Sequence, residues 1–217
     1  MPKWIKLIIA LLLLPVCAGA ASTLWFVLRA GYGADTVWVP LLAGAAIWTT
    51  IFLMLPKPMW IYVFGHELTH AIWAWIFGGQ VKKMKVTANG GHVVISKSNF
   101  LIVLAPYFFP LYAILVIFVF CLGNWLFNWH SYLVWFHLLL GATYAFHVTL
   151  TFHVLHTQQS DITGEGYLFS GVVIYLGNVI CLLIAIPLLT LRIGLFKILA
   201  HWCQETGRVF QWLHHLF

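Results

Sequence analysis

Long runs of apolar residues, separated by short polar segments, dominate the sequence. The first run extends from Trp4 to Leu28, about 25 residues, and a helix of that length can cross the hydrocarbon core of a bilayer. Hydrophobic residues make up 63% of the 217 residues, charged residues only 7%, and the mean hydropathy is +0.96. A soluble domain of this length would not be so apolar. The sequence therefore predicts a multi-pass integral protein of the cell membrane.

Proline, glycine and polar residues divide these runs into about six predicted transmembrane helices. The predicted helices cover residues 4–28, 37–55, 59–77, 100–122, 132–152 and 167–191. Ala18-Gly19-Ala20 resembles a signal-peptidase cleavage site. The apolar run continues to Arg29, however, so we expect an uncleaved first helix. Residues 192–217 form an amphipathic tail that we expect to lie along the membrane surface.

The charged residues and cysteines exclude other classes of protein. Eleven Lys and Arg residues against five Asp and Glu residues give a formal charge of +6. The positive residues are scattered at the ends of apolar runs, so they favour membrane-flanking positions over a nucleic-acid surface. The four cysteines are far apart and form no Cys-x-x-Cys pair, so they indicate neither a disulfide framework nor a cysteine metal site.

One segment, between 80 and 97, lacks the helical pattern and predicts a β-hairpin. Residues 81–87 and 92–96 read as two strands, and Asn89-Gly90 between them is a strong signal for a hairpin turn. The free edge of such a hairpin can pair with an extended peptide by strand addition. The other interpretation is a β-structured loop outside the membrane with no role in binding.

Two histidines and a glutamate interrupt the third apolar run in the sequence Gly65-His66-Glu67-Leu68-Thr69-His70. On a helix, His66 and His70 lie on one face about one turn apart, which is the spacing that two ligands of one Zn²⁺ need. Glu67 would lie beside the metal, where it can take a proton from a water molecule and pass it to a leaving amine. Ionisable residues are costly inside a membrane and usually mark a functional site. The pattern predicts metal-assisted hydrolysis.

A catalytic zinc site commonly has three protein ligands, and a carboxylate often joins two histidines. The most polar segment of the second half of the chain, 153–166, is the predicted source. Asp161 lies near the start of the last predicted helix, from which a short side chain could reach inward. Glu165, between two glycines, and the pair His153 and His156 are the alternatives. We expect a lone histidine in an apolar helix, such as His137 or His147, to bond to a neighbouring helix.

These features together resemble the site-2 protease family of intramembrane metalloproteases, in particular its small members without extra domains. The resemblance rests on residues 64–71, the hairpin after Gly78-Gly79, the break at Ala105-Pro106 and the segment Gln159-Ser160-Asp161. It implies that His66, His70 and Asp161 bind one Zn²⁺ per chain and that Glu67 is the general base. Many members carry Asn-Pro-x-x-Asp-Gly or Leu-Asp-Gly at the aspartate, where this chain has Gln-Ser-Asp-Ile. Gln158 or Gln159 would replace that asparagine.

The expected fold is an all-α polytopic membrane protein with about six transmembrane helices and one small membrane-associated β-hairpin. It forms a single domain, 1–217, with a metalloprotease-like core at 59–191, two additional helices in 1–56 and the tail. The expected function is a zinc-dependent intramembrane endopeptidase. Its partners are the lipid bilayer and a membrane-protein substrate presented as an extended strand to residues 80–97, with no nucleic acid. The alternatives are a membrane-embedded metal carrier or sensor, and an inactive scaffold that binds transmembrane helices.

Overall fold

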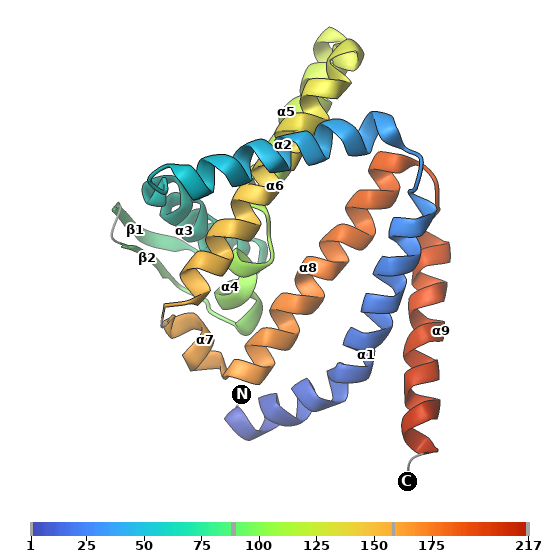
Figure 1. Cartoon of the computed structure of the whole chain (residues 1–217). Coiled ribbons are helices and arrows are strands. Elements are labelled where there is room, and N and C mark those ends of the chain that lie inside the picture. Colours follow the sequence, from blue (N-terminus) through green and yellow to red (C-terminus); the bar gives the residue numbers. More distant parts are fainter. Residues whose placement is uncertain (1, 88–89, 158, 216–217) are drawn as a thin grey trace. The chain divides into compact units, whose positions relative to one another are not determined.

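The computed structural model describes residues 2–87, 90–157 and 159–215, and helices make up most of it (Figure 1). The chain divides into two compact units. We call Asp35–Gln159 the motif unit and Met1–Ala34 with Ser160–Phe217 the terminal unit. The elements in chain order are α1 Lys3–Ala30, α2 Asp35–Met54, α3 Met59–Ile76, β1 Val81–Thr87, β2 Gly90–Ile95, α4 Phe100–Leu104, the 3₁₀ helix η1 Ala105–Tyr107, α5 Leu111–Phe127, the 3₁₀ helix η2 Trp129–Tyr132, α6 Leu133–Leu155, α7 Ser160–Glu165, α8 Tyr167–Thr190 and α9 Leu195–His214.

In the motif unit, α2 and α6 pack closely against each other (Figure 1). Two glycines allow this approach. A Cβ atom on Gly44 would collide with the carbonyl of Leu138, and one on Gly141 would collide with the carbonyl of Leu41. Small residues at a crossing point let helix backbones come together and are typical of helices that associate in membranes.

Helix α3 carries the histidine and glutamate motif. It begins at Met59, directly after the predicted break at Pro56-Lys57-Pro58, and its last residue is Ile76. Gly78 then has a φ of +67°, a left-handed conformation that glycine adopts without steric cost and that commonly ends a helix. The helix predicted at 59–77 is confirmed to within one residue.

A cluster of buried apolar side chains supports α3 within the motif unit. Tyr62 and Val63 of α3 pack against Phe146 and Leu150 of α6. Partly buried side chains surround this cluster: Trp48, Phe52, Met59, Val86, Tyr112 and Val154. Because they come from α2, α3, β1, α5 and α6, the cluster holds one face of the motif helix in place.

Strands β1 and β2 form the only sheet in the described part of the chain, and they pair antiparallel. This confirms the predicted hairpin, although β2 begins at Gly90, two residues before the predicted start. Of the predicted turn, Ala88 and Asn89 lie outside the described residues. An irregularity in the pairing lies between Val81 and Lys83, where β1 contains a bulge.

The predicted break in the run 100–122 is confirmed. The segment formed by α4 and η1 is bent by 80° against α5. Pro106 and Pro110 lie at this bend, and proline has no N–H to continue a helical hydrogen-bond ladder. Asn99 caps the start of α4, because its side-chain oxygen accepts a hydrogen bond from the Ile102 amide at 2.9 Å.

In the terminal unit, α1 packs against α8 and α9, and Figure 1 shows it between them. The predicted tail forms α9, which lies along α1. The hydroxyl of Ser22 donates to Glu205 at 2.8 Å, and the indole of Trp202 donates to the Val16 carbonyl at 3.1 Å. The ring of His201 stacks on Phe26 with 4.2 Å between the ring centres. These contacts join the tail to the first helix.

Within the described residues, four helical segments are long and apolar enough to cross a membrane: α1, α2, η2 with α6, and α8. The bent pair of α4–η1 and α5 would make a fifth crossing if it counts as one span. The membrane class is thus supported, while the number of six spans stays a prediction. Helix α3 is not among these segments, because its polar motif lowers the hydropathy of an 18-residue helix.

Candidate metal centre

The two motif histidines direct their imidazoles toward each other. Their Nε2 atoms lie 3.2 Å apart, and the rings meet edge to face. Two nitrogens bound to one tetrahedral Zn²⁺ are about 3.3–3.4 Å apart, since each Zn–N bond measures about 2.0–2.1 Å. The observed separation therefore fits two ligands of one ion. His70 is buried and His66 is half-buried, so protein covers one side of the pair and the other side is accessible to a ligand.

A backbone carbonyl sets the orientation of His70. Its Nδ1 atom lies 2.8 Å from the carbonyl oxygen of Ile102. A carbonyl oxygen can only accept, so Nδ1 carries the proton and donates it. The neutral ring then has its lone pair on Nε2, the atom that faces His66. Metal-binding histidines usually have such a second hydrogen bond, because it fixes both the tautomer and the ring plane.

The Ile102 carbonyl is available to His70 because of the proline four residues later. In a continuous helix, this carbonyl would accept from the amide of residue 106. That residue is Pro106, which has no amide proton. The amide of Ala105 still makes the ordinary helical bond to the Leu101 carbonyl, so the series of helical bonds stops just before the Ile102 carbonyl. The break between α4 and α5 thus supplies a free acceptor next to the buried imidazole.

Glu67 lies in the same turn of α3, and only 7% of its surface is exposed. Strand β2 passes directly over it. A Cβ atom on Gly91 would lie 2.8 Å from Cγ of Glu67 and 2.9 Å from Cγ1 of Val63, which is closer than real side chains allow. Glycine at this position lets the hairpin cover the carboxylate, and the sequence pattern alone did not reveal this contact.

His66 and Glu67 both line a pocket of about 300 Å³. Its walls come from α3, from Gly90 and Gly91 of β2, and from the C-terminal end of α6 and the residues after it. Polar groups on that last wall are His153, Thr157 and Gln159. The predicted base and one predicted ligand are thus accessible from a space large enough for part of a peptide.

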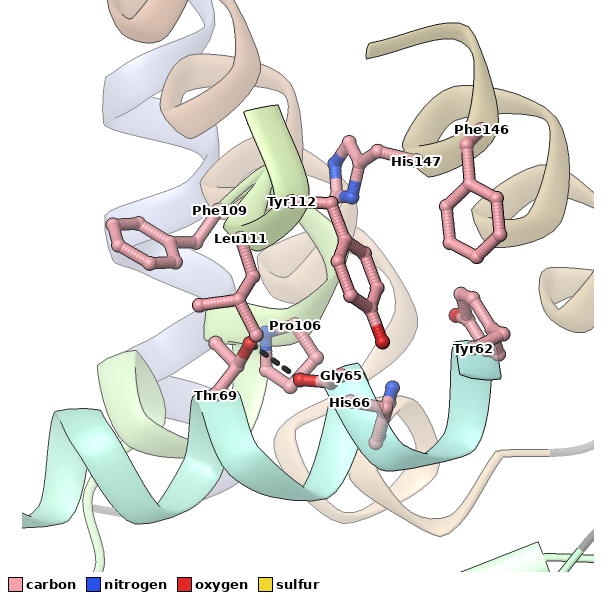
Figure 2. A pocket seen from close by; sticks show the side chains of 10 residues that line it. All are labelled: Tyr62, Gly65, His66, Thr69, Pro106, Phe109, Leu111, Tyr112, Phe146 and His147. Atoms are coloured by element: carbon pink, nitrogen blue, oxygen red, sulfur yellow. Dashed lines mark hydrogen bonds between the residues drawn. The ribbon is translucent and has the colours of Figure 1, made fainter. Parts of the chain in front are cut away.

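A second, smaller cavity of about 20 Å³ lies at His66 (Figure 2). Figure 2 shows that Tyr112 of α5 and His147 of α6 also line it. A space of this size has room for about one water molecule. The Tyr112 ring passes close to Gly65, where a Cβ atom would lie 2.7 Å from Cε2 of the ring. Gly65 thereby admits an aromatic ring beside the motif.

The candidate third ligands occupy different places. Asp161 is half-buried in the first turn of α7, in the terminal unit. Glu165, at the end of the same helix, forms an ion pair with Lys6 of α1. The side chain of Glu165 is 16% exposed and that of Lys6 is 10% exposed. Glu165 therefore already has a structural role within the terminal unit, which favours Asp161 as the acidic ligand.

The histidine alternatives also separate. His156 is exposed and its Nδ1 lies 2.6 Å from the Phe152 carbonyl of its own helix. His153 lines the 300 Å³ pocket. Of the two glutamines considered in place of the family's asparagine, Gln159 lines that pocket and donates to the Thr157 hydroxyl at 2.6 Å. Gln158 lies outside the described residues.

Comparison with protein-family models, with curated proteins and with solved structures finds no significant match. The resemblance to site-2 proteases thus rests on this chain's own residues and stays a prediction.

Proposed function

We propose that the chain is a zinc-dependent intramembrane endopeptidase of the site-2 protease type. The observation that carries this proposal is the convergence of the His66 and His70 Nε2 atoms, 3.2 Å apart, next to a buried glutamate at a pocket. The proposed ligands are His66, His70 and Asp161. Asp161 completes the set by its chemistry, since two imidazoles and one carboxylate leave a coordination position for water or substrate.

A bound Zn²⁺ would supply an electrophile that polarises the scissile carbonyl and makes the attacking water more acidic. Glu67 accepts one proton from that water as its oxygen attacks the carbonyl carbon. The C–N bond then breaks, and Glu67 returns the proton to the leaving amine. Glu67 is thus both the general base and the proton donor to the amine. Burial under β2 keeps its carboxylate in one position for both steps.

The hairpin gives the substrate a place to bind. A transmembrane helix has no free backbone groups, so it must unwind before its peptide bond can be attacked. Once extended, it can pair with the hairpin near residues 80–97. Gly90 and Gly91 belong to β2 and also line the pocket that contains Glu67. A strand bound there would enter the pocket along the sheet.

A metal carrier or sensor would use the histidines but has no need for Glu67, and an inactive scaffold needs no metal. The variant Glu67→Gln separates these functions, because it removes the base and leaves both imidazoles. In the purified full-length protein we expect it to keep zinc and to lose cleavage of a transmembrane substrate by about 10²-fold or more. The matched control is His156→Gln, an exposed polar change that should leave both zinc and cleavage unchanged. Normal cleavage by Glu67→Gln would refute the proposed role.

A further inference from the structure

The β1 strand exposes three lysines on one surface. In a regular strand, neighbouring side chains point to opposite faces. The bulge between Val81 and Lys83 interrupts this alternation. As a result, Lys82 and Lys83 are both exposed, as is Lys85, while Val81, Met84 and Val86 are half-buried. We call Lys82, Lys83 and Lys85 the lysine face.

This positive charge is not neutralised within the described part of the chain. No ion pair joins a lysine of this face to a described carboxylate. The sequence offers little opportunity, because no Asp or Glu occurs between Glu67 and Asp161. Opposite Lys85 in the register lies His92 of β2, and opposite Lys83 lies Val94. The face is therefore cationic, and like charges gathered on one strand favour an acidic partner.

The lysine face also adjoins the place where a substrate strand would lie. Strand β2 lines the pocket with Glu67, and β1 is its paired neighbour. A strand added to the free edge of β2 would lie two strand spacings, about 10 Å, from β1. A lysine and an acidic side chain together can bridge that distance. Side chains of the added strand on the exposed surface would then meet the lysine face.

We propose that the lysine face binds an acidic segment next to the cleavage site of the substrate, so that acidic flanking residues define the substrate class. This proposal rests on the proposed endopeptidase function. Anionic lipid headgroups would also be attracted to lysines. The position beside the catalytic pocket and on the surface of a two-stranded sheet favours a peptide segment.

The test measures binding separately from cleavage. The full-length Glu67→Gln protein in nanodiscs of zwitterionic lipid is titrated with labelled peptides that carry three Asp, three Asn or three Lys beside the same transmembrane segment. We expect the Asp peptide to bind about tenfold more tightly than the Asn peptide. Replacing all three lysines by Gln should remove this preference, and replacing them by Glu should transfer it to the Lys peptide.

The matched control carries Lys3→Gln, Lys57→Gln and Lys197→Gln, which remove the same charge from exposed sites outside the hairpin. It should keep the preference. Equal binding of the Asp and Asn peptides, or an unchanged preference after Lys→Glu reversal, would overturn the proposal. So would a charge effect that appears only as binding to vesicles of anionic lipid.

Cleavage by the protein with Glu67 intact separates failure of the lysine-face proposal from failure of the proposed endopeptidase function. Equal cleavage of the Asp and Asn peptides, with equal binding, would sustain the endopeptidase and refute the lysine face. A charge-dependent affinity without any cleavage would sustain the lysine face and refute the endopeptidase.

Discussion

The Nδ1 atom of His70 lies 2.8 Å from the carbonyl oxygen of Ile102, a group that belongs to the broken segment between α3 and α5. This bond links the helix break to the chemistry of the candidate metal centre. The break frees the carbonyl, the carbonyl accepts the hydrogen bond that Nδ1 donates and so holds the proton on Nδ1, and Nε2 is left with its lone pair to bind metal. Pro106 and His70 therefore act on one site, although they lie 36 residues apart in the sequence.

The first prediction concerns Pro106→Ala. The new amide proton can compete with His70 for the Ile102 carbonyl, so the imidazole loses part of its orientation. We expect zinc to bind about 10- to 100-fold more weakly, measured by competition with a chelator of known affinity. Pro110→Ala is the matched control, since Pro110 is also buried in the break but does not occupy the position four residues after Ile102, so its new amide proton would not compete for this carbonyl. Equal effects of the two variants would contradict the account.

The second prediction separates the two acidic residues of α7. Asp161→Asn should lower zinc content, because the proposed carboxylate ligand is lost. Glu165→Gln should leave zinc content unchanged but destabilise the fold, since it deprives the largely buried Lys6 of its charge partner. Metal analysis and thermal unfolding of both variants in one detergent distinguish these effects. Loss of zinc from Glu165→Gln alone would transfer the ligand role to Glu165.

The third prediction concerns the close contact between Gly65 and Tyr112. An alanine normally stabilises a helix relative to glycine by about 0.5–1 kcal/mol. At position 65, however, the methyl group would overlap the Tyr112 ring, so we expect Gly65→Ala to lower the free energy of unfolding by about 1–3 kcal/mol. Gly171→Ala in α8 is the control, because no atom lies within 4 Å of its added Cβ. A stabilised Gly65→Ala protein would refute this packing.

The fourth prediction concerns pH and the attachment of α9 to α1. The hydrogen bond from Ser22 lowers the pKa of Glu205, and the charges of Arg208 and His201 lower this pKa further. A carboxyl whose pKa is lower in the folded state stabilises the fold above its ordinary pKa, and this contribution is lost as pH falls through the lowered value. The protection of α9 amides against hydrogen exchange, taken relative to the intrinsic rate at each pH, should therefore fall on acidification below about pH 4.

Glu205→Gln provides the control for this prediction. An amide does not titrate, so the variant should show faster exchange in α9 already at neutral pH and a smaller change on acidification. An α9 whose exchange has the same pH dependence in both proteins would show that Glu205 does not hold it.

The sequence predicted those elements whose signals are local. The helix 59–77 lies between prolines and glycines, strand 81–87 has β-branched residues before a turn signal, and the break at 105–110 contains two prolines. Each of these signals depends on the backbone freedom of its own residues, which explains why the predicted limits agree closely with the structure. The two motif histidines converge because their spacing matches one helical turn.

The remaining features depend on contacts between distant segments. Nothing local in Ile102 indicates that its carbonyl would meet His70, although the proline four residues later is a signal that could have been used. The sequence pattern placed Gly91 between the two predicted strands, in the turn. In the structure, Gly91 belongs to β2 and lets this strand cover Glu67. The pairing of Lys6 with Glu165 joins residues 159 positions apart. Such pairs follow from tertiary packing, which composition and periodicity do not encode.

The central claim is that two imidazoles of α3 bind one zinc ion. X-ray absorption at the zinc edge of the purified, folded full-length protein tests it most directly. The account predicts one zinc per chain with nitrogen and oxygen ligands, two of them imidazoles at about 2.0–2.1 Å, and loss of this signal in His66→Gln/His70→Gln but not in His156→Gln. A folded protein without zinc, a zinc with sulfur ligands, or an unchanged spectrum in the double variant would contradict it.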